Sequence, residues 1–515
     1  MTLGVKDTLN PDLILSYINQ DMNSDKKQKA KIGERYYEAD HDIKQYKVYY
    51  VNDEGEFVED TNRSNIKISH PFFTELVDQK AQYLLSGSES YVKSDNAELQ
   101  KELDKYFNDD FKDELQELVT GTSTKGFDYI YGKKNKDDRL EFTYADGMGV
   151  VEVRAKDNGN LDDDNDYIIY HYVDTQQTQK GIKEVVKIEV WDKEKTYYYQ
   201  SLKGITGKTK KGECGLILDP DAKINPRPHV VFKEGDKYYG NGFDYIPFWR
   251  LDNNRKQMSD LKPIKALIDD YDLMSCGLSN NLQDISEGVY VVKGFNGSSL
   301  TELQQNIKTK KIVGVGKEGD VDIRTINIPY QARQTKLELD EKNIYRFGMG
   351  LNTAGLKDTS ATTNLAIKAA YALLDLKCNK LESKLKKMLM DILEVVIKEI
   401  NDTNKTDYSI DDVYFDFERE TITNDLDNAN VELLEANKRN VEITTLLNLA
   451  TKLPDETLME LIFEQLDLNY EDYKDLVEEK INEGKVDINE ASETLANVEP
   501  VEELIEEEVE EVPTA

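Results

Sequence analysis

Three short segments of the sequence have residue types that could bind a nucleotide or a metal ion. In GVGKEG, Gly314, Gly316 and Gly319 match the dinucleotide-binding spacing G-x-G-x-x-G. A dinucleotide phosphate needs a helix N-terminus after the third glycine. The residues that follow, DVDIRTINI, alternate in polarity as a strand does. The pattern therefore favours a glycine hairpin over a phosphate site.

The other two segments lack a residue that their chemistry requires. GITGKT, residues 204–209, resembles the end of a P-loop, but Leu202 stands where the first glycine should be. DDDNDY, residues 162–167, resembles a calcium loop, but Tyr167 replaces the glycine of the sharp turn and Val173 replaces the bidentate glutamate. We expect a solvated acidic turn there, and no phosphate loop at residues 204–209.

The acidic and imidazole side chains do not form a recognisable catalytic pattern. Four histidines, His41, His70, His171 and His229, have no metal-ligand spacing and no neighbouring cysteine. Asp and Glu together number 101, so isolated carboxylate pairs carry little information about acid–base catalysis. The sequence predicts a protein that is not an enzyme and has no cofactor or metal; a carboxylate-based, metal-dependent nuclease is the enzymatic alternative.

The length and the net charge of the chain limit the classes of protein to which it can belong. A chain of 515 residues predicts three or four structural units, and 38% hydrophobic residues suffice for a sizeable core. The charged fraction of 32% predicts a large solvated surface. A net charge of −35 argues against a protein that grips nucleic acid, because affinity for phosphate comes mainly from Lys and Arg. The acidity can also serve solubility alone.

Cysteine usage and hydropathy indicate the compartment. Cys214, Cys276 and Cys378 are far apart and odd in number, so the sequence predicts neither a disulfide framework nor a zinc ribbon, and fits a reducing cytoplasm. The N-terminal residues have no basic region followed by an apolar stretch, and no run approaches 18 apolar residues. We expect a protein that is neither secreted by this route nor membrane-spanning.

The elements that must position any site change in kind along the chain. Residues 10–108 have helical spacing, and residues 142–246 contain short β-branched and aromatic runs separated by turn residues, which predicts an antiparallel β-rich segment. A helix is predicted over residues 259–286. Two strand-like runs follow, with a short helix at residues 298–307 between them. Pro329 then fits the first turn of a helix that stops at Gly348.

The clearest predicted element is a long helix from Asn364 to about Ile400. Its apolar positions alternate spacings of four and three, and they are Ile367, Tyr371, Leu374, Cys378, Leu381, Leu385, Met388, Ile392 and Val395. A helix of this length spans roughly 55 Å at 1.5 Å per residue. So long an apolar stripe requires other helices beside it, from this chain or from other copies.

The C-terminal part is predicted to contain one strand, two or more helices and a disordered tail. DDVYFDFERETI, residues 411–422, reads as a strand, and helical patterns follow it. Beyond about Ile481 the chain is acidic and poor in aromatic residues, as disordered segments are.

This order of elements, together with several segments, resembles the portal proteins of siphophages that infect Gram-positive bacteria. The resemblance extends from about Tyr36 to about Glu479. The segments that carry it are RYYEADHDI, HPFFTELVDQKAQYLLSG, GNGFDYIPFWRLDNNR, SDLKPIKALIDDYDLMSCGLSNNLQDISEGVYVVKG and TTNLAIKAAYALLDLKCNKLESKLKKML. The loop after Gly348 has fewer clustered glycines than the family's commoner pattern, and the region after residue 425 matches least well.

The resemblance implies an α+β, mainly helical fold with the portal architecture of wing, stem, clip and crown around an axial channel. The implied regions are the wing at 1–254, a stem helix at 255–286, the clip at 287–328, a second stem helix at 329–347, the tunnel loop at 348–362, a long wing helix at 363–401, a wing strand at 402–424, the crown at 425–480 and the acidic tail at 481–515.

The resemblance also implies function and partners. A portal forms a homo-dodecameric ring at one capsid vertex, and double-stranded DNA passes through its channel during packaging and ejection. Its other partners are the terminase, which hydrolyses ATP, the head-completion or adaptor protein, and the major capsid and scaffolding proteins. The expected location is the virion, and the host cytoplasm during assembly, with no membrane partner.

Two groups of residues follow from the resemblance as expected contact sites. The tunnel-loop residues that would face DNA are Asn352, Thr353, Lys357, Asp358, Thr359 and Ser360. The clip residues that would dock the terminase and the adaptor are Tyr290, Lys293, Phe295, Lys310, Lys311 and Lys317. An ordinary surface loop is the alternative for the first group.

Net charge fits a channel that lets DNA slide. Twelve copies at −35 each carry −420, and an acidic lining would confine DNA by geometry without phosphate contacts that stall it. A different structural class is the alternative to the portal: an elongated helical scaffold or adaptor that self-associates through the long apolar stripe. A closed ring distinguishes the two.

Overall fold

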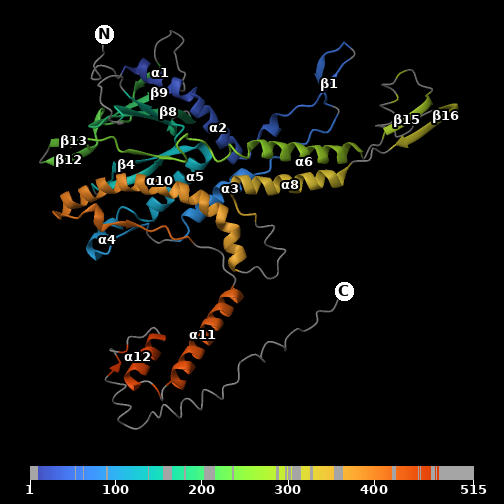
Figure 1. The fold of residues 1–515 in the computed structure, drawn as a ribbon. Coiled ribbons are helices and arrows are strands. Elements are labelled where there is room, and N and C mark those ends of the chain that lie inside the picture. The colour runs from blue at the N-terminus through green and yellow to red at the C-terminus, as the bar shows by residue number, and fades with distance from the viewer. Residues whose placement is uncertain are drawn as a thin grey trace. The chain divides into compact units, whose positions relative to one another are not determined.

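The computed structural model of the chain describes most of its residues. The described residues are 10–52, 54–61, 63–87, 91–136, 138–154, 165–178, 181–201, 215–234, 237–285, 289–295, 299, 303, 315–324, 329–352, 364–419, 425–449, 452, 454–465, 470, 473 and 474. They form two compact units, one comprising Met1–Asp358 and Ala370–Thr421, the other Thr359–Ala369 and Ile422–Ala515. Helices and strands are both abundant, which confirms the mixed α+β prediction (Figure 1).

The N-terminal part of the first unit is mainly helical, as predicted. Its helices are α1 (Pro11–Met22), α2 (Asp25–Tyr37), α3 (Phe72–Leu84), α4 (Ala97–Leu103) and α5 (Asp109–Lys125), with the short 3-10 helix η2 (Asp42–Gln45). Asn10, Ser24 and Asn108 cap α1, α2 and α5 by accepting hydrogen bonds from backbone amides of the first turn. The strands β1 (Tyr49–Val51) and β2 (Phe57–Glu59) form a hairpin that the sequence did not predict.

The β-rich segment is confirmed and begins earlier than expected, at Phe127. Strands β10 (Leu216–Leu218), β9 (Lys195–Ser201), β8 (Gly181–Trp191), β7 (Tyr167–Thr178) and β6 (Val150–Val153) lie in that order in one antiparallel sheet, where β11 (Arg227–Pro228) also pairs with β9. A second sheet has the order β14 (Phe248–Asp252), β4 (Phe127–Lys134) and β5 (Leu140–Ala145), and β12 (Val230–Glu234) pairs with β13 (Lys237–Asn241). In one core, α1 packs Ile14 and Ile18 against the larger sheet.

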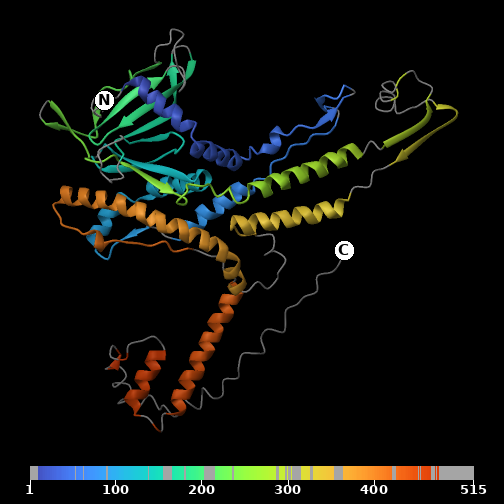
Figure 2. The same ribbon diagram turned by 45° about the horizontal axis from the view of Figure 1, so that its top comes forward.

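Two antiparallel helices, α6 (Lys265–Ile285) and α8 (Tyr330–Gly348), lie side by side beyond the sheets (Figure 2). The prediction of a helix from residue 259 is wrong for its first six residues, which form turns such as Lys262 N–H to Ser259 O. Pro263 has no amide hydrogen and disfavours helical geometry in the residue before it, so the helix begins only after it.

The C-terminal end of α8 differs from the prediction by one residue. Gly348 is the last helical residue, and Met349, with a φ of 57°, adopts the left-handed conformation that closes the helix. Gly348 does not end the helix, but a larger residue would not fit there, because a Cβ atom would lie 2.6 Å from Leu76 Cδ1. The glycine therefore permits close packing of α8 on α3.

Two strands, β15 (Val289–Phe295) and β16 (Val315–Arg324), form an antiparallel pair between α6 and α8 in the chain. The prediction of a glycine hairpin at GVGKEG is wrong, because Gly316 and Gly319 lie within β16. They lie where the register shifts between Lys293, which pairs with Asp320, and Phe295, which pairs with Val315. A strand nevertheless follows Gly319, so no helix N-terminus is available to a phosphate. Of the predicted short helix at 298–307, only residues 299 and 303 are described, and residue 303 is helical.

The long helix α10 spans Asn364–Asn404, so it is confirmed and is four residues longer than predicted. Of the predicted stripe, seven side chains from Tyr371 to Ile392 are buried, whereas Val395 is half-buried and Val396 takes its place in the core. The side chain of Ile367 lies outside the described residues.

Of the strand predicted at residues 411–422, only two residues form a strand within the described part of the chain. In the last turn of α10, Asn401 accepts hydrogen bonds from the Tyr408 amide and the Thr406 hydroxyl, which closes the turn that follows the helix. The 3-10 helix η4 (Ile410–Asp412) follows, and β17 (Tyr414–Phe415) pairs with β3 (Val92–Lys93).

The second unit contains α11 (Asp425–Asn448) and α12 (Asp455–Gln465), which pack together as the predicted C-terminal helices. The acidic tail at 481–515 lies outside the described residues. None of the described helices combines the length and the apolar composition needed to cross a bilayer.

Candidate functional site

The loop base, residues 348–352 at the end of α8, is the part of the predicted tunnel loop that the structure describes. Met349 turns the chain in a left-handed conformation, and the Gly350 amide donates to the Tyr345 carbonyl at 3.0 Å. A Cβ atom on Gly350 would lie 2.0 Å from Leu76 Cδ2. The backbone is therefore held directly against α3 where the loop begins.

Two side chains from other helices bind the backbone of the loop base. Gln79 of α3 donates from Nε2 to the Leu351 carbonyl at 3.0 Å, and its Oε1 accepts from the Leu351 amide at 2.9 Å. Lys377 of α10 donates from Nζ to the Gly348 carbonyl at 2.9 Å. The loop base is thus fixed by α3 and α10 as well as by its own helix.

A buried ion network supports this arrangement. Lys80 of α3 is 1% exposed and lies 2.9 Å from Asp260 Oδ2, and Lys377 lies 3.3 Å from the same oxygen. Asn253 completes the set, since its Oδ1 accepts from Lys80 and its Nδ2 donates to Asp260. Burial would raise the pKa of Asp260, but the two lysines hold it well below its usual value. The carboxylate is therefore charged and shared between α3 and α10.

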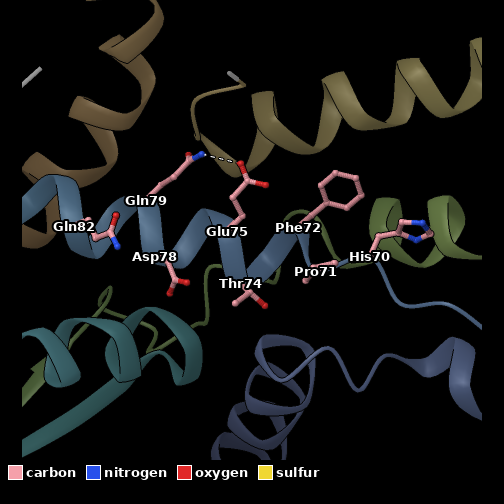
Figure 3. A pocket seen from close by; sticks show the side chains of 8 residues that line it. All are labelled: His70, Pro71, Phe72, Thr74, Glu75, Asp78, Gln79 and Gln82. Carbon is pink, nitrogen blue, oxygen red and sulfur yellow. Dashed lines mark hydrogen bonds between the residues drawn. The ribbon is translucent and has the colours of Figure 1, made fainter. Parts of the chain in front are cut away.

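A pocket of about 530 Å³ follows the exposed side of α3 beside the loop base (Figure 3). Its lining residues are His70, Pro71, Phe72, Thr74, Glu75, Asp78, Gln79 and Gln82. In Figure 3 Glu75 and Gln79 point to the side of α3 on which α8 lies, and Asp78 points to the other side.

The pocket's two carboxylates are engaged by groups of the same chain. Glu75 accepts from the Tyr345 hydroxyl at 2.6 Å and from Gln79 at 3.1 Å, and Asp78 accepts from the Tyr37 hydroxyl at 2.8 Å. Burial and the bond to Asp78 raise the pKa of Tyr37 to about 12. Through these contacts both carboxylates connect helices of the same chain. Within the described residues, no group of His, Cys, Asp and Glu has a metal-binding arrangement.

A third polar cluster ties α6 to the N-terminal part. Asp272 is fully buried, lying 2.6 Å from His41 Nδ1 and 2.7 Å from His70 Nδ1, and it also accepts from the His70 amide at 3.0 Å. Burial would raise the pKa of Asp272, but the bonds from both histidines lower it. Two of the four histidines that look scattered in the sequence therefore meet at one carboxylate, where they hold α6 in place.

The predicted clip residues fall on the β15–β16 hairpin or outside the described residues. Tyr290, Lys293 and Phe295 lie on β15 and Lys317 lies on β16, so the structure brings these four to one small sheet. Lys293 and Lys317 are exposed, and Phe295 is half-buried. Lys310 and Lys311 lie outside the described residues.

Most of the predicted DNA-facing residues cannot be located. Asn352 is described and half-buried at the end of the loop base. The other five lie outside the described residues: Thr353, Lys357, Asp358, Thr359 and Ser360.

Sequence reasoning missed the side chains that hold the loop base: Gln79, Lys80, Asp260 and Lys377. One signal was present, because Lys80 occupies a core position of α3, three or four residues from Val77, Leu76 and Leu84. A charged residue inside an apolar helical stripe predicts a buried partner. Nothing in the sequence identified that partner as Asp260, which lies 180 residues away.

Known proteins resemble this chain over most of its length. Residues 17–482 match the family described as "Phage portal protein, SPP1 Gp6-like". The "Portal protein" of Bacillus phage SPP1 is 28% identical over 397 residues, which cover 76% of this chain and 74% of that protein. The "Portal protein" of Clostridium phage phiCD119 is 23% identical over 415 residues, which cover 76% of this chain and 85% of that protein.

Proposed function

Because this chain belongs to the phage portal family described as SPP1 Gp6-like, we propose that it forms a dodecameric ring at one capsid vertex, through which DNA is packaged and ejected. The observation that carries the proposal is the family match over residues 17–482, which includes the paired helices α6 and α8 and the segment after them. The protein acts as a structural component of the virion, and the terminase supplies ATP hydrolysis.

The described elements correspond to portal regions as follows. Residues 1–254, with the two larger sheets, form the wing, which α10 and the strand segment at 402–424 rejoin. Helices α6 and α8 are the stem, and residues 287–328, with the β15–β16 hairpin, are the clip. Residues 425–480 form the crown, and 481–515 form the acidic tail. The support for this assignment is the order of elements, since a hairpin lies between two antiparallel helices that end in a loop.

Residues 348–362 form the tunnel loop that faces DNA, with Asn352, Thr353, Lys357, Asp358, Thr359 and Ser360 at the constriction. The loop base supports this role mechanically. Gln79 and Lys377 hold the chain at Leu351 and Gly348, so force on the loop passes to α3 and α10. The acidic net charge of −35 per copy favours sliding over binding at the lining.

The clip docks the terminase during packaging and the head-completion or adaptor protein afterwards. Lys293 and Lys317 are exposed on one two-stranded sheet, where acidic side chains of a partner have access to both. Tyr290, Phe295, Lys310 and Lys311 complete the docking set. Major capsid and scaffolding proteins contact the ring from outside.

Deletion of Lys357–Ser360 tests the DNA-facing role. We expect DNA packaging to fall strongly while rings still assemble, because the deletion leaves the loop base and the stem helices unchanged. Replacing the same four residues by Gly and Ser at equal length is the matched control for loop length. Normal packaging by the deletion variant contradicts the tunnel-loop assignment.

Charge reversal on the clip tests the docking role. A Lys293→Glu, Lys317→Glu variant is expected to form rings that bind the terminase and the adaptor at least tenfold more weakly. Lys29→Glu, at an exposed lysine of α2, is the control for added negative charge away from the clip. Unchanged binding of both partners by the double variant removes the clip assignment.

A further inference from the structure

The β1–β2 hairpin presents an apolar face to solvent. Tyr49 pairs with Glu59 and Val51 pairs with Phe57, so these four side chains lie on one face of the hairpin. Tyr49 is 52% exposed, Val51 58% and Phe57 79%. Among the described residues, β1 and β2 form a two-stranded sheet with no third strand.

Such a hairpin is not stable on its own in water. Two strands without packing on a third element are marginal at best, and each exposed Å² of apolar surface forgoes about 25 cal/mol of stabilisation. Contiguous apolar patches on a soluble protein mark interaction sites. The face of Tyr49, Val51 and Phe57 therefore requires a partner that buries it.

The hairpin lies on one flank of α6, and α8 lies on the opposite flank (Figures 1 and 2). The chain that follows the hairpin is tied to α6 by Ile66 N–H to Asn280 Oδ1 at 2.6 Å and by Ile68 N–H to Cys276 Sγ at 3.2 Å. On the other flank, Asp270 accepts from Lys336 of α8 at 2.6 Å. Cys276 and Asn280 share one helix face, whereas Asp270 projects about 100° away from it around the helix axis.

The outward face of α8 complements the hairpin in polarity and in charge. Leu339 is 52% exposed, and Lys342 and Arg346, three and seven residues further on, are exposed beside it. Within the described part of the chain neither cation makes an ion pair with a carboxylate of its own molecule. Residues 47–60 contain one basic and five acidic residues, and Glu54 and Glu56 are exposed near the tip.

We propose that the β1–β2 hairpin of each copy docks on α8 of the next copy in the ring, around Leu339 and Lys342. The occupant is a second copy of this chain, because the apolar face and the acidic tip match an apolar and basic face on the opposite flank of the same helix pair. Such a head-to-tail contact uses two different surfaces, so it repeats from copy to copy and forms a ring when the rotation between copies closes. The inference rests on the proposed ring.

Disulfide trapping tests the contact. Cys276 and Cys378 are buried, and Cys214 is replaced by serine to remove the remaining native thiol. In that background, rings that carry both Phe57→Cys and Leu339→Cys are oxidised and separated on a non-reducing gel. We expect a ladder of covalent oligomers up to the full ring, whereas either single variant stays monomeric. The matched control is Ile182→Cys with Leu339→Cys, because Ile182 is 78% exposed on β8.

The outcomes separate this inference from the proposed function. If the unaltered chain forms no rings, the proposed function itself is contradicted. If rings form but the Phe57→Cys, Leu339→Cys protein gives no more ladder than the Ile182 control, docking of the hairpin on α8 is overturned.

A second variant covers the case in which the paired cysteines prevent folding. Phe57→Asp is expected to weaken ring assembly at least tenfold on dilution while circular dichroism stays unchanged, and Ile182→Asp is expected to keep the ring. Rings of Phe57→Asp that are as stable as those of the unaltered chain overturn the proposal, and assign the hairpin to another partner.

Discussion

The two ends of the α6–α8 helix pair are built in opposite ways. At the inner end, the buried Asp272 binds His41 and His70, and Asp260, whose side chain is 15% exposed, is shared between the buried Lys80 and Lys377. At the outer end, the β15–β16 hairpin pairs only with itself among the described strands, and its lysines are exposed. The inner end is specified by buried charge, and the outer end is left accessible.

The two ends therefore differ in what their charges do: buried charges fix the geometry of the helices, and exposed charges are accessible to other molecules. Buried ion pairs contribute little net stability but impose a large penalty when one partner is lost, so they fix geometry. Exposed charges on a small sheet constrain the fold weakly and remain available to other proteins. The helix pair thus joins a fixed loop base to an exposed hairpin.

The largest expected effect is at the inner end. Asp260→Ala leaves Lys80 and Lys377 buried without their carboxylate, and we expect a loss of about 3–5 kcal/mol in the free energy of unfolding. The midpoint of urea unfolding measures it. Lys29→Ala, which breaks an exposed pair with Asp25, is the control and should change stability by less than about 0.5 kcal/mol. Equal effects of the two variants would contradict the contrast between the two ends.

Acid should weaken the inner end through Asp272. The bonds from His41 and His70 lower its pKa in the folded protein, so below about pH 4 the unfolded chain binds more protons and stability falls. The stabilisation by the ionised Asp272 carboxylate is complete above the pKa that this group has in the unfolded chain. It is lost as the pH falls through the lower pKa that the group has in the folded protein. Melting temperatures at pH 7, 4 and 3 should fall less steeply in Asp272→Asn. Parallel curves for both proteins would rule out this linkage.

A smaller effect is expected at the loop base. Gln79→Ala removes both hydrogen bonds to Leu351 and should cost about 1–2 kcal/mol. Hydrogen exchange of the Leu351 amide should become faster, because its acceptor is lost. Gln82→Ala, on the exposed side of the same helix, is the control and should leave that amide unchanged. Unaltered exchange in Gln79→Ala would show that Gln79 does not hold the loop base.

The smallest effect on stability belongs to the outer end. Lys317→Ala should change the free energy of unfolding, measured by urea, by less than about 0.5 kcal/mol, since the side chain is exposed on β16. A loss comparable to that of Asp260→Ala would mean that the outer end is as tightly specified as the inner one.

Periodicity predicted most of the long elements. The stripe from Tyr371 to Ile392 identified α10, because a spacing of three and four residues directly encodes one buried helix face. The alternating runs likewise located most strands of the larger sheet. The β1–β2 hairpin was missed because its residues lie in a segment with helical spacing on both sides, and the start of α6 was misplaced because Pro263 was not weighed.

The candidate site was predictable only in part. Tyr290, Lys293, Phe295 and Lys317 do share one hairpin, as expected of neighbouring segments on either side of a short insert. The loop base depends instead on residues far apart in the sequence, such as Gln79 and Leu351. A single sequence contains no signal for such pairs, because side-chain hydrogen bonds follow from the tertiary packing of α3, α8 and α10.

The ring is the central claim, and electron microscopy of the purified chain with native mass measurement tests it most directly. The account predicts closed rings with a central hole and a mass of about twelve copies of the 59.1 kDa chain. Monomers or rods at micromolar concentration would contradict it, and would favour an elongated helical scaffold that associates through α10.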